Sequence, residues 1–172
     1  METDVIIIKG APGSGKSETA KALSAYFPKG IRMEVDTVRS MVISVDWTNQ
    51  QEHINMLQIA ANMTLDYLNY NYKPVVVIDT FSGDKVKGFA EFLNNAKENI
   101  SINIFALYTE ENELKRRLEI RSDDMFKDFT VSKKLNNDII KIKYEKEQII
   151  DTTQKTTKET ADNIYNILCC NT

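Results

Sequence analysis

A glycine-rich segment that directly follows a short apolar run constrains this chain of 172 residues more than any other feature. Residues Gly10 to Ser17, GAPGSGKS, match the pattern G-x-x-x-x-G-K-[ST] in full. The run before it, VIIIK at Val5 to Lys9, is typical of a strand buried on both faces of a parallel sheet. Residues Ser17 to Phe27 predict a helix, which Pro28 ends. This succession of strand, loop and helix predicts a phosphate-binding loop.

The residue types in this loop suit the binding of phosphate. Glycine lets the backbone turn so closely that successive N–H groups point at one anion, where any Cβ would clash. The positive end of the following helix adds to the attraction. Lys16 is expected to reach the β- and γ-phosphates, and Ser17 to ligate Mg²⁺ through its hydroxyl. Nine residues are expected around the nucleotide: Gly10, Ala11, Pro12, Gly13, Ser14, Gly15, Lys16, Ser17 and Glu18.

The same loop occurs in GTPase switches, ATPase motors and small kinases. Switch GTPases read guanine with an Asn-Lys-x-Asp tetrapeptide, which this sequence lacks. Motors usually need a longer chain and arginine fingers from neighbouring subunits. A chain of this length fits the small kinases best, so we expect ATP and Mg²⁺ as cofactors.

Predicted strands and helices alternate along almost the whole chain. Strands are expected at 5–9, 31–35, 75–79, 102–108 and 149–151, and helices at 17–27, 37–44, 49–72, 84–98, 111–121, 132–146 and 159–169. Such alternation predicts an α/β three-layer sandwich, in which helices cover both faces of a parallel five-stranded sheet. We expect one domain over residues 1–172.

Composition excludes several classes of protein. With 42% hydrophobic and 27% charged residues, the chain has the make-up of an ordinary globular protein. No apolar run approaches the roughly 20 residues of a membrane span, and the acidic N-terminus is unlike a secretory signal, so we expect no membrane partner. A net charge of −3 gives no overall attraction to nucleic acid. The adjacent Cys169 and Cys170 cannot form a disulfide that links distant parts of the fold, which favours a reduced, cytoplasmic protein. The oligomeric state stays open.

A second group of polar residues follows the strand expected at 31–35. The carboxyl ends of parallel strands line the ligand crevice, so Asp36 is expected to face the γ-phosphate. There its carboxylate would take the proton of an acceptor hydroxyl during phosphoryl transfer. Arg39, on the same side of a helical turn, would bind an anionic part of the acceptor. A helix N-cap, which aspartate favours, is an equally good interpretation of Asp36.

At this point the sequence resembles a known group. GAPGSGKS, Asp36-x-x-Arg39 and the VIDT that ends at Thr80 are similar to the kinase domain of phage-type polynucleotide 5′-hydroxyl kinases. They are also similar to chloramphenicol phosphotransferase and, more distantly, to zeta-toxin kinases. All belong to the P-loop kinase superfamily that includes adenylate kinase, which implies a nucleoside monophosphate kinase-like fold with a helical lid. The resemblance implies that Asp36 is the general base, that Arg39 contacts a 3′-phosphate of the acceptor and that Thr80 lies at the acceptor site.

The segment from Leu114 to Asp124 resembles the lid of the same superfamily, and we expect a lid region at about 111–146. Arg117 and Arg121 are four residues apart and would project from one face of a helix. Such a pair would neutralise charge on the transferring phosphoryl group. Arginine is scarce here, with five against seventeen lysines, which favours this role over a solvated surface pair.

Asp79 ends the apolar run at 75–79 and takes the place of a Walker-B-type acid. It would hold Mg²⁺ through water or bind the acceptor, and an ordinary strand-end aspartate that begins a turn is an equal interpretation. His53 is the only histidine and lies in the helix expected at 49–72, where we expect it at the surface.

We therefore expect an ATP-dependent kinase that transfers the γ-phosphate to an acceptor hydroxyl. The acceptor is either a polynucleotide or nucleotide 5′-hydroxyl, which Arg39 and the basic lid favour, or a small molecule. Two alternatives stay open: a nucleoside monophosphate kinase, and a regulatory module that binds ATP without transferring phosphate.

Overall fold

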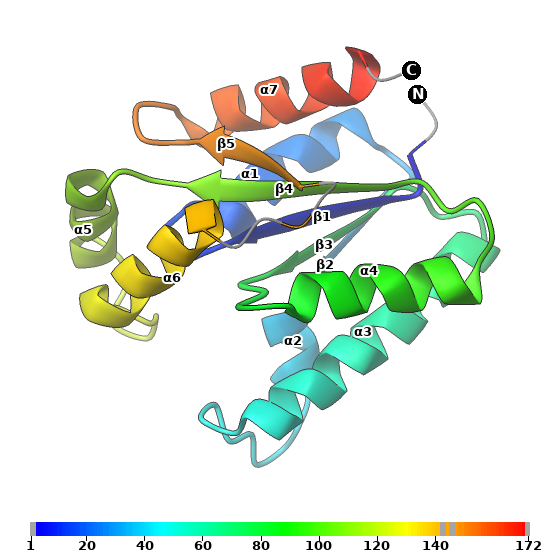
Figure 1. Cartoon of the computed structure of the whole chain (residues 1–172), viewed down its shortest axis with the longest axis horizontal. Coiled ribbons are helices and arrows are strands. Elements are labelled where there is room, and N and C mark those ends of the chain that lie inside the picture. The colour runs from blue at the N-terminus through cyan, green and yellow to red at the C-terminus, as the bar shows by residue number, and fades with distance from the viewer. Residues whose placement is uncertain (1–2, 142–143, 145–146, 171–172) are drawn as a thin grey trace.

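Five parallel strands form one sheet in the computed structural model, which describes residues 3–141, 144 and 147–170 (Figure 1). The strands are β1 (Val5–Gly10), β2 (Ile31–Glu34), β3 (Val75–Asp79), β4 (Ile102–Tyr108) and β5 (Glu147–Asp151). In space they follow the order β2-β3-β1-β4-β5, and each pair of neighbours is parallel. The prediction of a parallel five-stranded sheet is confirmed.

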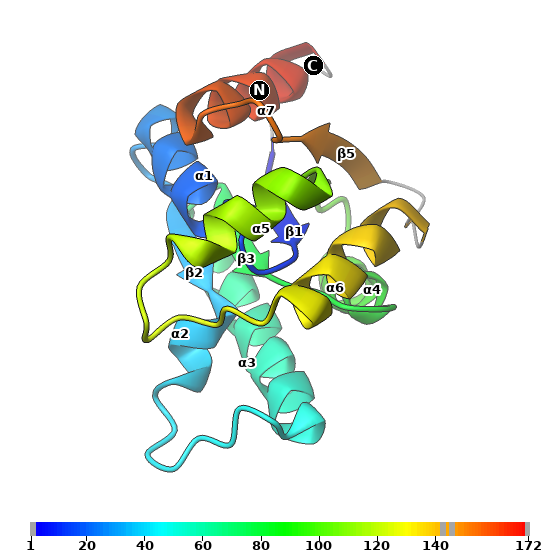
Figure 2. The same cartoon turned by 90° about the vertical axis from the view of Figure 1, so that its left-hand side faces the viewer.

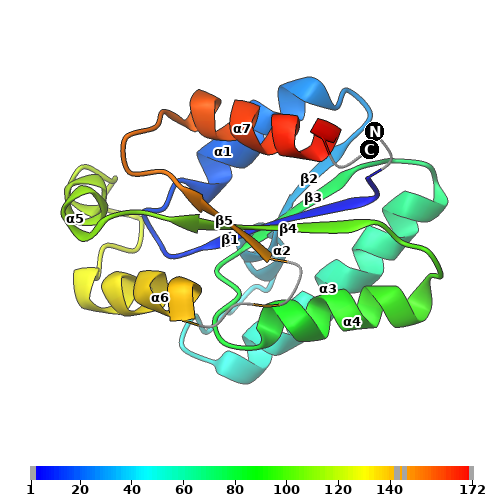
Figure 3. The same ribbon diagram turned by 45° about the horizontal axis from the view of Figure 1, so that its top comes forward.

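Helices cover both faces of this sheet. They are α1 (Lys16–Leu23), α2 (Val35–Arg39), α3 (Gln50–Asn69), α4 (Lys85–Ala96), α5 (Glu111–Glu119), α6 (Phe129–Lys141) and α7 (Thr157–Cys170), with a 3-10 turn at Ser24–Tyr26. Figure 3 shows α1 and α7 on one face and α3, α4 and α6 on the other, which gives three layers. None of the helices in the described ranges is both long and apolar enough to cross a membrane.

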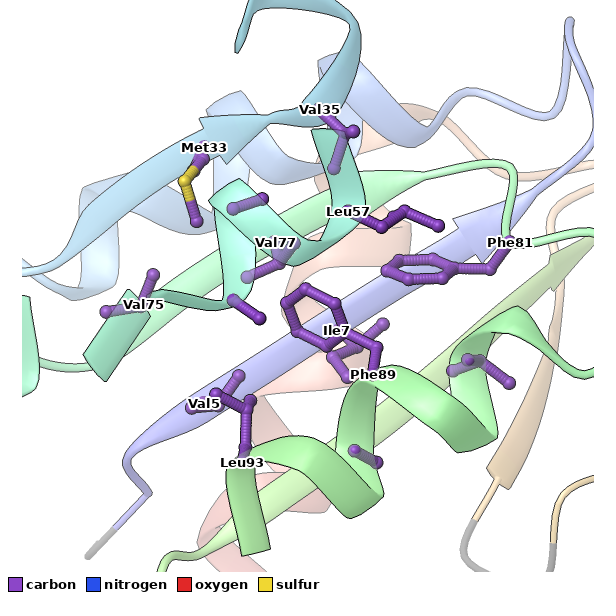
Figure 4. Close-up of a cluster of buried hydrophobic side chains, with 14 of the residues drawn as sticks. Val5, Ile7, Met33, Val35, Leu57, Val75, Val77, Phe81, Phe89 and Leu93 are labelled. Carbon is purple, nitrogen blue, oxygen red and sulfur yellow. The ribbon is translucent and has the colours of Figure 1, made fainter. Parts of the chain in front are cut away.

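The arrangement of β1 explains why its sequence is apolar without interruption. Successive side chains of a strand point to opposite faces of the sheet. Val5 and Ile7 pack with Leu57 of α3 and Phe89 of α4 in one buried cluster (Figure 4). Ile6 and Ile8 face a second cluster, which α1 and α7 complete. Both faces of β1 are therefore in the core, and the phosphate loop begins at the carboxyl end of this buried strand.

The helix after β2 begins earlier than predicted. α2 starts at Val35, directly after β2, and the Val35 side chain is fully buried in the core cluster. Glu34 occupies the N-cap position, and Asp36 lies within the first turn. The interpretation of Asp36 as an N-cap is therefore wrong, and its carboxylate does not cap the start of this helix.

In the predicted lid region, both helices have other bounds than those predicted from the sequence. α5 ends at Glu119, so Arg121 lies in the chain beyond it. α6 runs from Phe129 to Lys141. The last part of the helix predicted at 132–146 falls on residues of which the structure describes only 144.

A buried ion pair joins the centre of the sheet to its β5 edge. Lys9 of β1 and Glu147 of β5 approach to 3.1 Å, and their side chains are only 4% and 0% exposed. Since β4 lies between these strands, the pair bridges across it. β5 begins at Glu147, two residues before the predicted start, and Glu147 is there paired with Ile104 of β4.

Replacing one member of this pair is expected to destabilise the protein more than replacing both. Lys9→Met leaves the Glu147 carboxylate buried without its partner, and the free energy of unfolding should fall by about 3 kcal/mol. Lys9→Met combined with Glu147→Leu removes both charges and should recover most of that loss. Urea denaturation followed by circular dichroism measures both values. A double variant less stable than Lys9→Met alone would contradict this account.

Candidate active site

The phosphate-binding loop lies between β1 and α1, at the carboxyl ends of the strands (Figure 2). Gly13 and Gly15 have φ values of 86° and 91°, in the left-handed region that favours glycine. A Cβ on Gly13 would also lie 3.1 Å from the side chain of Leu118 on α5. The nine predicted nucleotide-binding residues thus run from the end of β1 into the first turn of α1, and the loop packs against α5.

The two polar residues at the end of the loop contact protein oxygens. Lys16 Nζ donates to the carbonyl of Ala11 at 2.9 Å. Ser17 Oγ donates to Glu34 Oε2 at 2.8 Å. This bond uses the hydroxyl hydrogen of Ser17, so its oxygen lone pairs stay available to a cation.

Charged groups from three parts of the chain gather around the amine of Lys16. Burial lowers the pKa of the Lys16 ammonium from its ordinary 10.5 to about 8. The carboxylates of Asp79, Asp36 and Glu34 oppose this decrease in pKa, whereas the guanidinium of Arg121 adds to it. The structure therefore brings the ends of β2 and β3 and the chain after α5 together at the phosphate loop.

Asp36 has the chemistry of a base at this place. Its side chain is open to solvent, as the approach of a substrate requires. Partial desolvation raises the pKa of the Asp36 carboxyl, and the nearby carboxylate of Asp79 raises it further. The cationic side chains of Lys16 and Arg39 oppose the increase in pKa. A carboxylate with a raised pKa holds a captured proton more strongly, which suits general-base catalysis.

Both carboxylate oxygens of Asp79 have partners. Oδ2 accepts the backbone N–H of Phe81 at 2.8 Å, so Asp79 does begin a turn. Oδ1 lies 3.1 Å from Nε2 of His53. The side chain is almost fully buried, and its negative charge raises the pKa of the Lys16 ammonium.

The donor atoms at the site fit Mg²⁺. Ser17, Asp36 and Asp79 offer oxygen, and Mg²⁺ usually combines one or two carboxylates with substrate phosphates and waters. Within the described ranges, no three His, Cys, Asp or Glu side chains form a cluster that would hold a metal by itself. The residues are therefore suited to a Mg²⁺ ion that arrives with a nucleotide.

His53 is buried, and the prediction of a surface position is wrong. It lies near the start of α3, four residues before Leu57, on the side of the helix that packs against the sheet. Nε2 reaches Asp79, and Nδ1 lies 3.0 Å from Nζ of Lys85. The helical spacing to Leu57 is the signal that places His53 on the inner face of α3.

Arg39 contacts its own chain rather than projecting freely into the crevice. Its Nε donates to Glu52 Oε1 at 3.0 Å, and one terminal nitrogen donates to the carbonyl oxygens of Asn49, at 3.1 Å, and Asp46. The guanidinium also lies 5.1 Å from the centre of the Trp47 ring. Arg39 is only 4% exposed and holds the segment between α2 and α3 in place.

The two predicted lid arginines do not form a pair. Arg117 donates to Thr152 Oγ1 at 3.0 Å and to the Thr152 carbonyl at 2.6 Å, and so lies against the chain after β5. Arg121 donates to the carbonyl of Phe126 at 2.8 Å and lies near Lys16. The prediction of a shared helix face is wrong, because α5 ends before Arg121.

A cavity of about 450 Å³ opens beside the phosphate loop. Ser14, Gly15 and Arg117 line it, together with the first turn of α1 and residues 152–157. A cavity of this size suits a small ligand. The contribution of 152–157 was missed from the sequence, where its only signal is the polar, threonine-rich run TTQKTT.

Thr80 lies where the chain after β3 meets α6. It lines a cavity of about 20 Å³ with Lys9 of β1 and with Leu135 and Ile139 of α6. The side chain is half-buried. Thr80 is thus next to Asp79 in the chain but faces the second helix of the predicted lid region.

A family of known proteins matches most of this chain. Residues 6–151 match the sequence profile of a family described as an AAA domain. The chain belongs to the AAA domain family. No curated protein matches this AAA-domain protein in sequence.

Solved structures show how widely its fold is shared. A sugar kinase from Janibacter sp. HTCC2649, unliganded, is 11% identical, with 97% of this chain and 95% of that chain covered and a TM-score of 0.70. Shikimate kinase from Acinetobacter baumannii in complex with shikimate is 14% identical, with 98% and 94% covered and a TM-score of 0.68. A chain of the Pnkp1/Rnl/Hen1 RNA repair complex is 18% identical, with 81% and 44% covered and a TM-score of 0.65. These likenesses confirm the predicted P-loop kinase fold.

Binding of ATP in the absence of Mg²⁺ is expected to weaken between pH 7 and pH 9. The pKa of the Lys16 ammonium is about 8, so the charge that attracts phosphate is present below that pH and lost above it. Binding of the anion favours the charged form, and the affinity should fall by up to about tenfold over this range. Isothermal titration calorimetry at each pH measures the affinity.

Lys16→Met is the control. This variant should bind ATP more weakly and show a nearly flat pH profile. The same decline in both proteins would mean that another group titrates.

Proposed function

We propose that this AAA-domain protein is an ATP-dependent kinase that transfers the γ-phosphate to a hydroxyl group. One observation supports this most directly: Asp36 and Asp79 lie close enough to Lys16 to affect the pKa of its ammonium. Lys16 belongs to the loop that would hold the phosphates, and Asp36 is a carboxylate with a raised pKa. A phosphate donor and a proton acceptor would thus share one site, as transfer to an alcohol requires.

The nucleotide would lie along the phosphate loop, with its base in the cavity that Arg117 lines. The backbone N–H groups of residues 10–18 would hold the phosphates, and Lys16 would contact the β- and γ-phosphates. Mg²⁺, bound through Ser17 and Asp79, would neutralise charge on the phosphates. Arg117 already contacts the chain after β5, so it would lie on the nucleoside side of the loop.

In the transfer step, the acceptor hydroxyl attacks the γ-phosphorus and gives its proton to Asp36. A new O–P bond forms, the bond between the γ-phosphorus and its bridging oxygen breaks, and ADP leaves with that oxygen. Arg121 lies near Lys16 and would stabilise charge on the transferring group. Since Arg117 is bonded to Thr152 and lines the cavity proposed for the base, Arg121 is the lid arginine that we assign to this step.

The acceptor that we favour is a small molecule with a free hydroxyl. Arg39 is bonded to Glu52 and to two backbone carbonyls, so an acceptor phosphate would have to displace these partners. Asp36 and Asp79 also repel an anionic acceptor. The similar structure of a sugar kinase agrees with this class. Thr80, which follows Asp79, is the proposed hydrogen-bonding partner of the acceptor.

Two other acceptors, and a function without phosphate transfer, are the alternatives to this proposal. A polynucleotide 5′-hydroxyl is favoured by the likeness to a chain of an RNA repair complex. A nucleoside monophosphate would receive the γ-phosphate on its own phosphate and would need no base at Asp36. A module that only binds ATP would show no dependence on any acceptor.

Asp36→Asn is expected to reduce phosphoryl transfer by about 10²- to 10⁴-fold while leaving ATP affinity nearly unchanged, because an amide cannot take the proton. The assay follows label from γ-labelled ATP with Mg²⁺ into a panel of sugars, hydroxylated ring acids, hydroxyl-bearing antibiotics, nucleosides, nucleoside monophosphates and 5′-hydroxyl oligonucleotides. Label should enter a small hydroxyl compound, and a 3′-phosphate on an oligonucleotide should bring no gain.

The control variant is Asp66→Asn, which changes an exposed carboxylate on α3. It should transfer phosphate like the unchanged protein. Transfer by Asp36→Asn at the unchanged rate would rule out the proposed base, and label in nucleoside monophosphates alone would replace the alcohol acceptor by a phosphate.

A further inference from the structure

Asp79, His53 and Lys85 form a chain of contacts that leads from the phosphate loop to the start of α4. His53 Nε2 lies 3.1 Å from Asp79 Oδ1, and His53 Nδ1 lies 3.0 Å from Lys85 Nζ. Lys85 also donates to Gln50 Oε1 at 2.9 Å. Asp79 and His53 are only 5% and 8% exposed, so little water competes for these contacts. The proposed catalysis assigns no role to His53 or Lys85.

The two ends of this chain determine where the imidazole carries its proton. A lysine ammonium has only donors, so Nδ1 of His53 accepts a hydrogen from Lys85. A carboxylate has only acceptors, so Nε2 of His53 donates to Asp79. Neutral His53 with its hydrogen on Nε2 satisfies both contacts, and Lys85 thereby selects the tautomer that donates to Asp79.

This donation matters because the charges of Asp79 and of the Lys16 ammonium act on each other. The carboxylate of Asp79 is the largest of the charge effects that raise the pKa of Lys16. Its Oδ2 is held by the N–H of Phe81, so the bond from His53 is the one that orients Oδ1. Without it, Oδ1 would be a buried acceptor with no partner, and pairing with Lys16 would satisfy it. Lys16 would then be less available to phosphate.

We propose that His53 is a positioning residue, which keeps Asp79 from pairing with Lys16 and is itself held in the required tautomer by Lys85. The role rests on the proposed function, in which Lys16 and Asp79 act on the same phosphates. His53 touches neither nucleotide nor acceptor and acts through Asp79.

The tautomer is tested first, in the protein without nucleotide. His53 is the only histidine, so its two ring nitrogens give the only imidazole signals in a long-range ¹H–¹⁵N spectrum. The hydrogen should be on Nε2, and Lys85→Met should shift the population toward the other tautomer. A hydrogen on Nδ1 in the unchanged protein overturns the proposal.

The positioning role is tested by ATP binding, measured by calorimetry at pH 7. His53→Leu removes donor and acceptor and should weaken binding by about tenfold, whereas His53→Gln keeps one of each and should stay within about threefold. In an Asp79→Asn background, His53→Leu should have no further effect. Thermal unfolding of each variant shows whether it is folded. Lys85→Met tests the same chain of contacts without a substitution at the buried residues His53 and Asp79.

The outcomes separate this proposal from the proposed function. Equal weakening by His53→Leu in both backgrounds, or by His53→Gln and His53→Leu alike, overturns the positioning role. If His53→Leu weakens ATP binding only in the protein with Asp79, but the unchanged protein transfers phosphate to no acceptor, the proposed function fails. The effect of His53 on Lys16 through Asp79 then still stands.

Discussion

The ammonium group of Lys16 is the charge on which the rest of this site depends. It lies half-buried in a loop of backbone N–H groups, where burial is the main cause that lowers its pKa. The carboxylates at the ends of β2 and β3 keep that ammonium charged near neutral pH. The order β2-β3-β1 makes this possible, because it brings three neighbouring strand ends to one edge of the sheet. Asp79 ends β3, and Asp36 and the phosphate loop follow β2 and β1.

Placing several charges at a partly buried edge is unfavourable unless each has a partner. The chain supplies these partners from different elements. Asp79 has His53 and the backbone of Phe81, and Ser17 has Glu34. The buried pair of Lys9 and Glu147 on the same sheet follows the same rule. Two uninterrupted apolar clusters on either face of β1 hold the strands in register and fix the positions of these partners.

The sequence predicted the features that local pattern encodes. The strands at 75–79 and 102–108 were predicted to the residue, since β-branched and apolar runs bounded by polar residues mark buried strands. The phosphate loop was predicted because its motif requires a fixed spacing within eight residues. Asp36 and Asp79 were placed at strand ends, where parallel sheets present them to a ligand.

What sequence reasoning missed depends on contacts between distant residues. The bonds of Arg39 to Glu52 and to the carbonyl of Asn49 were not predicted, because they form only once α3 folds back on α2. His53 was placed at the surface because its partner Asp79 is 26 residues away. The separation of Arg117 from Arg121 follows from the end of α5 at Glu119, a boundary that the sequence pattern does not mark.

The most direct test is the pKa of the Lys16 side chain, measured by NMR in protein with labelled lysine and assigned with Lys16→Met. The unchanged protein should give a value of about 8. The pKa should fall further in both Asp36→Asn and Asp79→Asn, because each removes a negative charge that stabilises the ammonium. A value near the ordinary 10.5, unaffected by either substitution, would contradict a shared site of Lys16 with the two carboxylates.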